Sequence, residues 1–262
     1  MQSTGIEKVA IIGAGLSGLS LALALHDYGI QPTVFELRQG SYNMGGAVML
    51  SPNALRVLDC IGRPESVYQR VRPKGFTFDK LSFVNDQHEL SDVYYFGQEQ
   101  AYGYHGLRLY RQVLIEELVN MCRERGIQIN YERKFGQVIS EDEDGVVFSM
   151  ADGEQFSSDM LVGADGIHSS VREYLSPVIP QFGGSLAMTS HIPTSAVRIP
   201  KDYPLPVTVL GRTGAFVLAP QNQDGSELLV GYQRPYPKQD RQGWEKLVSD
   251  KAALHELSLI HI

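Results

Sequence analysis

The sequence predicts an α/β protein in which a Rossmann-like domain is interwoven with a β-sheet domain. Three observations lead to this fold class. A glycine-rich turn joins a short apolar strand to a helix near the N-terminus. Two further segments have apolar residues at helical spacing, and long stretches between and after them have strand-like composition. Such an alternation favours two domains that are each built from separate pieces of chain.

The glycine-rich turn follows the apolar strand expected at residues 9–12 and opens a helix. Gly13, Gly15 and Gly18 have the spacing of a dinucleotide-binding fingerprint. The first glycine permits a tight turn, the second lets the backbone approach a pyrophosphate, and the third allows close helix–strand packing. Phosphates would then lie at the positive end of the helix. Glu36 comes 18 positions after the third glycine, where a carboxylate should accept hydrogen bonds from a ribose hydroxyl.

Two further helices are expected. The first begins at Pro52, with Ser51 as a plausible N-cap, and ends at Gly62. The second is amphipathic and extends from Tyr110 to a stop at Gly126, with Arg111 in its first turn.

Strands are expected in the remaining segments. Residues 75–104 and about 180–235 are rich in aromatic and β-branched residues. Residues 127–163 should form strands joined by tight turns, because Asp144-Gly145 and Asp152-Gly153 are strong hairpin signals. These blocks predict one domain from residues 1–74 and 105–177, and a second from 75–104 and 178–262.

Composition excludes several classes of protein. The net charge is −7 and no basic tract occurs, so a nucleic-acid partner is not expected. Cys60 and Cys122 lie far apart, which predicts no disulfide scaffold and no zinc site, and favours a reducing, cytoplasmic location. The acidic run at residues 141–144 is interpreted as a solvated turn, not a metal site. No apolar run is long enough for a membrane span.

A second motif follows the strand expected at residues 160–162. Gly163-Ala164-Asp165-Gly166 places an acidic residue and glycines at the carboxyl end of a strand, where open α/β sheets bind ligands. Together with the fingerprint, residues 45–62 (GGAVMLSPNALRVLDCIG) and residues 107–118 (LRLYRQVLIEEL), this segment resembles the FAD-dependent aromatic hydroxylases. These are the class A flavoprotein monooxygenases typified by para-hydroxybenzoate and salicylate hydroxylases.

The resemblance implies a set of FAD contacts. It assigns the pyrophosphate to the three fingerprint glycines and the adenosine ribose to Glu36. It places the backbone at Ala47 close to the flavin, and gives Arg111 a contact with the FAD phosphate and ribityl region. Asp165 belongs to the family's Asp-Gly motif, which is associated with FAD and the nicotinamide cofactor. Arg108 is a weaker candidate, whose alternative role is a charge at a strand end.

The resemblance also implies a reaction. NAD(P)H would reduce FAD, and O₂ would supply one oxygen atom to hydroxylate or epoxidise an aromatic or polyketide-like small molecule. No catalytic residue is assigned. The family's later Gly-Asp motif is missing from this sequence, so we expect a chain that is incomplete at the C-terminus. Two alternatives stay open: a non-oxygenating flavoprotein oxidoreductase, and an inactive FAD-binding fragment.

Overall fold

The structure is a computed structural model that describes residues 5–40, 45–176, 178–212 and 214–258. The chain folds into two compact units, each assembled from separate pieces. The first unit comprises residues 1–45, 53–74 and 110–180, and the second comprises 46–52, 75–109 and 181–262. Residues 46–52 and 105–109 belong to the second unit, whereas the sequence predicted them in the first domain. The α/β class with a parallel sheet is confirmed.

The first unit contains a four-stranded parallel sheet with its helices, together with a three-stranded antiparallel sheet. Its helices are α1 (Leu16–Asp27), α2 (Pro52–Cys60, whose first residue belongs to the second unit), α3 (Val67–Val71), the 3-10 turn η1 (Arg72–Lys74), α5 (Arg111–Glu124) and α6 (Ser170–Leu175). Its strands are β1 (Lys8–Ile12), β2 (Gln31–Phe35), β8 (Gln128–Asn130), β9 (Phe135–Asp142), β10 (Gly145–Met150), β11 (Gln155–Ser158) and β12 (Met160–Gly163).

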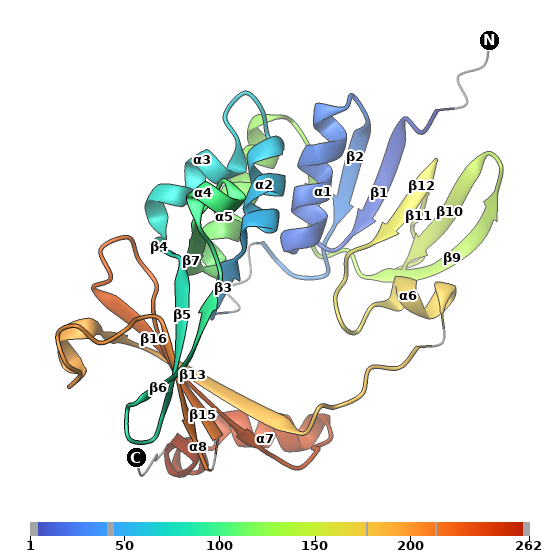
Figure 1. The fold of residues 1–262 in the computed structure, drawn as a ribbon. Helices are drawn as coiled ribbons and strands as arrows, with labels where there is room; N and C mark the ends of the chain where they lie inside the picture. The colour runs from blue at the N-terminus through green and yellow to red at the C-terminus, as the bar shows by residue number, and fades with distance from the viewer. Residues whose placement is uncertain (1–4, 41–44, 177, 213, 259–262) are drawn as a thin grey trace. The chain divides into compact units, whose positions relative to one another are not determined.

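The parallel sheet of the first unit has the order β12-β1-β2-β8. Ile12 lies opposite Gly163 on one side and opposite Phe35 on the other, so the carboxyl ends of three strands meet at one edge. Helix α1 covers one face of this sheet and packs against α5, while β9, β10 and β11 cover the other face (Figure 1). The sheet is therefore the middle layer of three.

The layer of β9–β11 is held to the parallel sheet by aromatic packing. The Phe35 ring lies 4.8 Å from the Phe156 ring and 5.8 Å from the fully buried Phe148 ring. Ala10 and Ile12 of β1 belong to the same cluster. The expected turns at Gly145 and Gly153 are present, both with positive φ.

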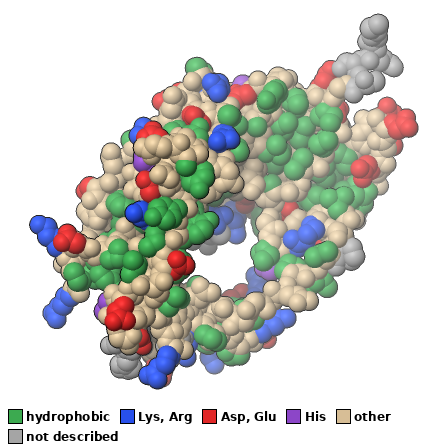
Figure 2. All heavy atoms as spheres, viewed as in Figure 1, with side chains coloured by type: hydrophobic (Ala, Val, Ile, Leu, Met, Phe, Trp, Pro, Cys, Tyr) green, Lys and Arg blue, Asp and Glu red, His purple; other side chains and the backbone are tan. Residues whose placement is uncertain are grey.

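The acidic run at the tip of the β9–β10 hairpin is exposed, in agreement with a solvated turn. Residues 141–144 are all exposed. Figure 2 shows acidic side chains at this end of the β9–β10 hairpin. Asp142 and Asp144 form a local turn, because the Asp142 Oδ1 accepts a hydrogen bond from the Asp144 N–H at 2.9 Å.

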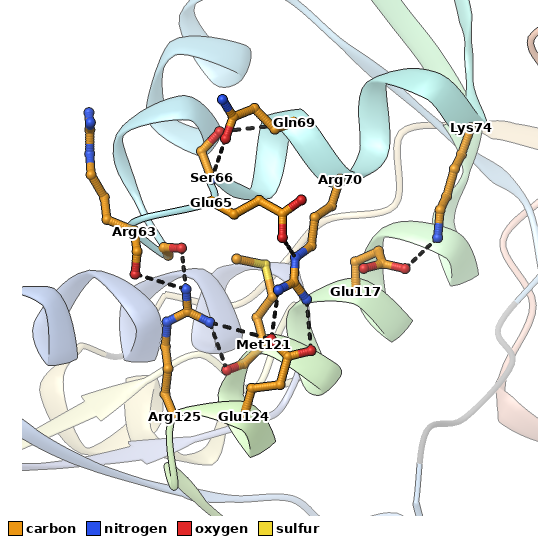
Figure 3. A network of polar contacts seen from close by, with 11 residues as sticks. Arg63, Glu65, Ser66, Gln69, Arg70, Lys74, Glu117, Met121, Glu124 and Arg125 are labelled. Atoms are coloured by element: carbon orange, nitrogen blue, oxygen red, sulfur yellow. Dashed lines mark hydrogen bonds and ion pairs between the residues drawn. The ribbon is translucent and has the colours of Figure 1, made fainter.

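Ion pairs join α3 to α5 within the first unit (Figure 3). Arg70 of α3 donates to both carboxylate oxygens of Glu124, at 2.8 and 2.6 Å, and to Glu65 at 2.9 Å. Lys74 pairs with Glu117, about two turns earlier on α5. This network links residues 65–74 to α5.

The second unit is mostly β-structure. Its strands are β3 (Ala47–Leu50), β4 (Phe76–Phe78), β5 (Lys80–Asn85), β6 (Leu90–Tyr95), β7 (Gly106–Tyr110, whose last residue belongs to the first unit), β13 (Ser185–Pro193), β14 (Val207–Gly211), β15 (Gly214–Pro220) and β16 (Glu227–Pro235). Its helices are α4 (Glu99–Tyr102), the 3-10 turn η2 (Thr194–Ala196), α7 (Arg241–Ser249) and α8 (Lys251–Ser258).

Two sheets form the second unit. The larger has the order β13-β16-β15-β14-β5-β6, in which only the β14–β5 pair is parallel. The smaller has the order β3-β7-β4. Val84, Val207 and Leu218 form part of the core on the larger sheet. Across the described ranges of both units, no helix is long and apolar enough to cross a membrane.

Candidate functional site

The three fingerprint glycines have different structural requirements. Gly13 has a φ of 110°, and a Cβ there would collide with the carbonyl of Ala164. A Cβ on Gly18 would collide with the carbonyl oxygen of Gly13, so this glycine permits the close approach of helix and strand. Gly15 is different, because a Cβ there would meet no atom within 4 Å. The space beside Gly15 is open, so a ligand can come close to the protein backbone there.

Backbone hydrogen bonds bring the turn together with both acidic motifs. The Gly13 N–H donates to the Phe35 carbonyl at 2.7 Å, and the Ala164 N–H donates to the Ile12 carbonyl at 2.7 Å. The residues that follow β1, β2 and β12 therefore meet at one edge of the parallel sheet. Gly13, Glu36 and Asp165 all lie at this edge, which is the ligand-binding edge of open α/β sheets.

Glu36 is bonded to the glycine turn itself. Its Oε2 accepts a hydrogen bond from the Ala14 N–H at 2.8 Å, and its Oε1 accepts one from the Arg38 N–H at 2.9 Å. The sequence predicted a ribose contact but not this bond to the turn. Each carboxylate oxygen retains acceptor capacity, so a ribose hydroxyl could still be bound.

Only one carboxylate oxygen of Asp165 is hydrogen-bonded within the described chain. Its Oδ2 accepts a hydrogen bond from the Ser170 N–H at 2.8 Å, which holds the start of α6. Its Oδ1 is buried and has no hydrogen-bond partner in the part of the chain that the structure describes. A buried carboxylate oxygen without a partner is costly, and a ligand hydroxyl would satisfy it.

Arg111 begins α5, whose N-cap Tyr110 makes no side-chain capping bond. Helices α1 and α5 pack together, and each runs antiparallel to its neighbouring strand, because α1 follows β1 and α5 leads into β8. Both helices thus begin at the carboxyl edge of the sheet. The Arg111 Nε is buried and has no partner among the described residues.

Helix α1 presents free backbone donors at the same edge. Its N-cap is Gly15, which provides no side-chain cap, and its first turn contains no acidic residue. The helix N-terminus therefore offers unpaired N–H groups and a positive partial charge to an anion. The open space at Gly15, the unpartnered Asp165 Oδ1 and the unpartnered Arg111 Nε together fit a nucleotide that carries phosphates and hydroxyls.

Two of the candidate FAD contacts, the backbone at Ala47 and the side chain of Arg108, lie in the second unit. Ala47 begins β3, whereas the other six predicted positions belong to the first unit. Arg108 lies on β7, and its Nε is buried without a partner in the described chain. Burial lowers the pKa of Arg108 to about 10. Arg108 is therefore not an ordinary charge at a strand end, because it lies in the middle of β7 and its Nε is buried.

Comparison with known proteins gives the family. A family model described as FAD binding domain matches residues 7–261. The FAD-dependent monooxygenase pynG of Aspergillus niger is 32% identical over 183 residues, which cover 66% of this chain and 39% of pynG. Salicylate hydroxylase of Pseudomonas putida is 28% identical over 198 residues, which cover 73% of this chain and 44% of the hydroxylase. The chain thus spans less than half the length of these two curated relatives.

The fold is also that of solved flavoproteins. The crystal structure of Klebsiella pneumoniae HpxO complexed with FAD and uric acid has a TM-score of 0.73 and 22% identity, over 93% of this chain and 60% of that chain. The expected resemblance to FAD-dependent aromatic hydroxylases and the expected cofactor, FAD, are confirmed. The chain belongs to the FAD binding domain family.

Proposed function

We propose that this chain is the FAD-binding part of a monooxygenase that uses NAD(P)H and O₂ to hydroxylate or epoxidise an aromatic or polyketide-like small molecule. One observation carries the proposal: the fingerprint turn, Glu36 and Asp165 converge at one sheet edge, with open space beside Gly15. That edge suits a dinucleotide better than any other class of ligand, because it combines free helix donors with hydroxyl acceptors.

Each residue at this edge would bind a different part of the cofactor. The backbone at Gly13, Gly15 and Gly18 would hold the pyrophosphate at the start of α1. Glu36 would bind the adenosine ribose. Asp165 would accept a hydrogen bond from a hydroxyl through Oδ1, and Arg111 would place its guanidinium on a phosphate or the ribityl chain.

In the second unit, the backbone at Ala47 would pass close to the flavin. Residues 75–104 and 178–262 would form the substrate domain. When bound, FAD supplies the redox chemistry by which electrons from NAD(P)H activate O₂, so that one oxygen atom enters the substrate and the other leaves as water.

The names of the relatives support this reaction. PynG is named as an FAD-dependent monooxygenase, and the Pseudomonas putida relative is named for salicylate, an aromatic carboxylate. An exposed free thiol at Cys60 and a buried one at Cys122 are compatible with a cytoplasmic location, which is part of the proposal.

Binding of FAD by residues 1–262 tests the site. We expect near-stoichiometric flavin absorbance in the purified protein after removal of excess FAD. Asp165→Asn keeps an acceptor for the Ser170 N–H but replaces the free acceptor with a donor. It should weaken FAD binding roughly tenfold or more and leave the unfolding free energy of the FAD-free protein within about 0.5 kcal/mol.

Asp144→Asn, at the exposed hairpin tip, is the matched control and should bind FAD as the wild type does. Equal FAD affinity in Asp165→Asn and wild type would contradict the assigned role. Transfer of one ¹⁸O atom from ¹⁸O₂ to salicylate, coupled to NAD(P)H oxidation, would support oxygenation. NAD(P)H oxidation without oxygen transfer would indicate an oxidoreductase, and FAD binding without turnover would indicate an inactive fragment.

A further inference from the structure

A cavity of about 250 Å³ lies within the first unit, between the parallel sheet and the layer of β9–β11. Residues of β1, β2 and β8 line one wall, and residues of β10 and β11 line the other. Pockets that hold drug-sized molecules have volumes of about 300–1,000 Å³. The cavity therefore suits a molecule of one or two rings.

The wall formed by the parallel sheet is polar. Thr33 of β2 pairs with Gln128 of β8, and Phe35 pairs with Asn130. Side chains alternate between faces along a strand, so these four side chains share the face that lines the cavity. Thr33 and Asn130 are half-buried, and Gln128 is exposed at the margin of the cavity. Parallel sheets are ordinarily apolar on a face that another layer covers, so three polar side chains on this face are unusual.

The two carboxamides present a donor beside an acceptor. The Gln128 Nε2 donates to the Asn130 Oδ1 at 2.9 Å, and the Asn130 Nδ2 donates to the Val34 carbonyl at 3.4 Å. This arrangement leaves the Gln128 Oε1 as an acceptor and the second amide hydrogen of Asn130 as a donor. Asparagine and glutamine side chains pair in this way with the N6 and N7 edge of adenine.

The opposite wall is aromatic. The Phe148 and Phe156 rings are stacked, with centroids 5.8 Å apart and an interplanar angle of 22°. Phe156 is half-buried and lines the cavity, so a planar ligand can pack against its ring. Among the described residues no acidic side chain lines the cavity, and Lys8 is its one charged residue. A neutral planar ring therefore fits better than a cation.

We propose that this cavity binds a purine-type base, whose face packs on Phe156 and whose edge pairs with the carboxamides of Gln128 and Asn130. The inference goes beyond the proposed monooxygenase function and does not depend on it, because the site is separate from the dinucleotide edge.

Strand geometry separates the two sites. Since Phe35 lines the cavity, the next residue, Glu36, points to the other face of the sheet, where it bonds the Ala14 N–H. The cavity also includes Lys8 at the start of β1, which lies roughly 16 Å along the strand from Gly13.

The test compares two planar ligands of similar size. Adenine and indole are titrated by calorimetry into the FAD-loaded chain and its Gln128→Ala and Gln137→Ala variants. Indole has two fused rings but no acceptor beside a donor at its edge. Gln137 is an exposed residue of β9 in the same unit that does not line the cavity, so Gln137→Ala is the matched control. Bound FAD keeps adenine out of the dinucleotide site, and amide NMR spectra locate the ligand.

We expect the wild type and Gln137→Ala to bind adenine at least tenfold more tightly than indole. Gln128→Ala should lose roughly tenfold in adenine affinity, with little change for indole. Adenine should shift the amide signals of Thr33, Gln128 and Phe156 and leave those of Gly13 and Gly15 in place.

Four results would overturn the inference. They are no adenine binding by the wild type, equal affinity for adenine and indole, unchanged adenine affinity in Gln128→Ala, and amide shifts at Gly13 and Gly15 instead of Thr33 and Gln128. If Gln128→Ala does not fold, the mapping on the wild type decides. If the chain binds no FAD, the proposed function fails, while the same mapping on the FAD-free chain still decides whether adenine occupies this cavity.

Discussion

Two alanine substitutions in the same turn should separate ligand binding from folding. Gly15 has a φ of −82° and a ψ of −174°, an extended conformation that alanine adopts without strain, and a methyl group there would meet no protein atom within 4 Å. We therefore expect Gly15→Ala to change the unfolding free energy by less than about 0.5 kcal/mol. Its methyl group would occupy the space assigned to the pyrophosphate, so FAD affinity should fall roughly tenfold or more, about 1.4 kcal/mol.

Gly18→Ala should have the opposite signature. Its methyl group would collide with the Gly13 carbonyl oxygen, and neither backbone can move freely between β1 and α1. Overpacking of this kind costs about 1–3 kcal/mol. For a chain of this size the melting temperature of the FAD-free protein should fall by roughly 2–12 °C.

Thermal unfolding by circular dichroism without FAD and FAD titration of the folded proteins measure the two effects independently. The reasoning would be refuted if Gly15→Ala lowered the melting temperature as much as Gly18→Ala. It would also be refuted if Gly15→Ala bound FAD as tightly as the wild type.

Three further outcomes are expected. Phe148→Ala, in the fully buried cluster, should cost about 3–5 kcal/mol by leaving a cavity, measurable by urea unfolding; a loss below about 1 kcal/mol would contradict the packing. The hydrogen bond from Arg70 lowers the pKa of Glu124, so this pair stabilises the fold at pH values above the usual glutamate pKa of about 4.3. This stabilisation is lost as the pH falls and Glu124 is protonated. The melting temperature of Arg70→Gln should therefore fall less than that of the wild type when the pH is lowered. Burial raises the pKa of Cys122 to about 12, so only exposed Cys60 should react with a thiol reagent in the native protein, and both should react in urea.

Local signals in the sequence predicted most elements. The helix start at Pro52 is confirmed, and the helix expected over residues 110–126 is present as Arg111–Glu124, because an N-terminal proline and a regular apolar stripe are properties of the segment itself. The turns at Gly145 and Gly153 are confirmed for the same reason. The short helix α4 at Glu99–Tyr102 was not predicted, since a single turn leaves no periodic pattern.

Features that depend on distant residues were not predictable from the sequence. The fingerprint identified Glu36 as a ribose ligand but could not show its bond to the Ala14 N–H, which depends on how β2 ends beside the turn. The sequence offered Arg108 as a weaker candidate or a charge at a strand end, but it could not show that its Nε is buried, because burial depends on what packs over β7. The assigned FAD roles of individual residues stay predictions.

The order of the parallel sheet sets the order in which this protein can fold during synthesis. Strand β1 is the first to leave the ribosome, yet one of its two neighbours, β12, is made after residues 75–109 of the second unit have already emerged. Contacts of such long sequence separation form slowly. For much of translation, β1 therefore has an open edge, and Phe35 has not yet packed against Phe148 and Phe156. Neither unit can complete its fold until all of its separate segments have been synthesised. We expect a long-lived, chaperone-dependent nascent chain, in which a premature stop before β12 leaves the sheet without its final neighbour.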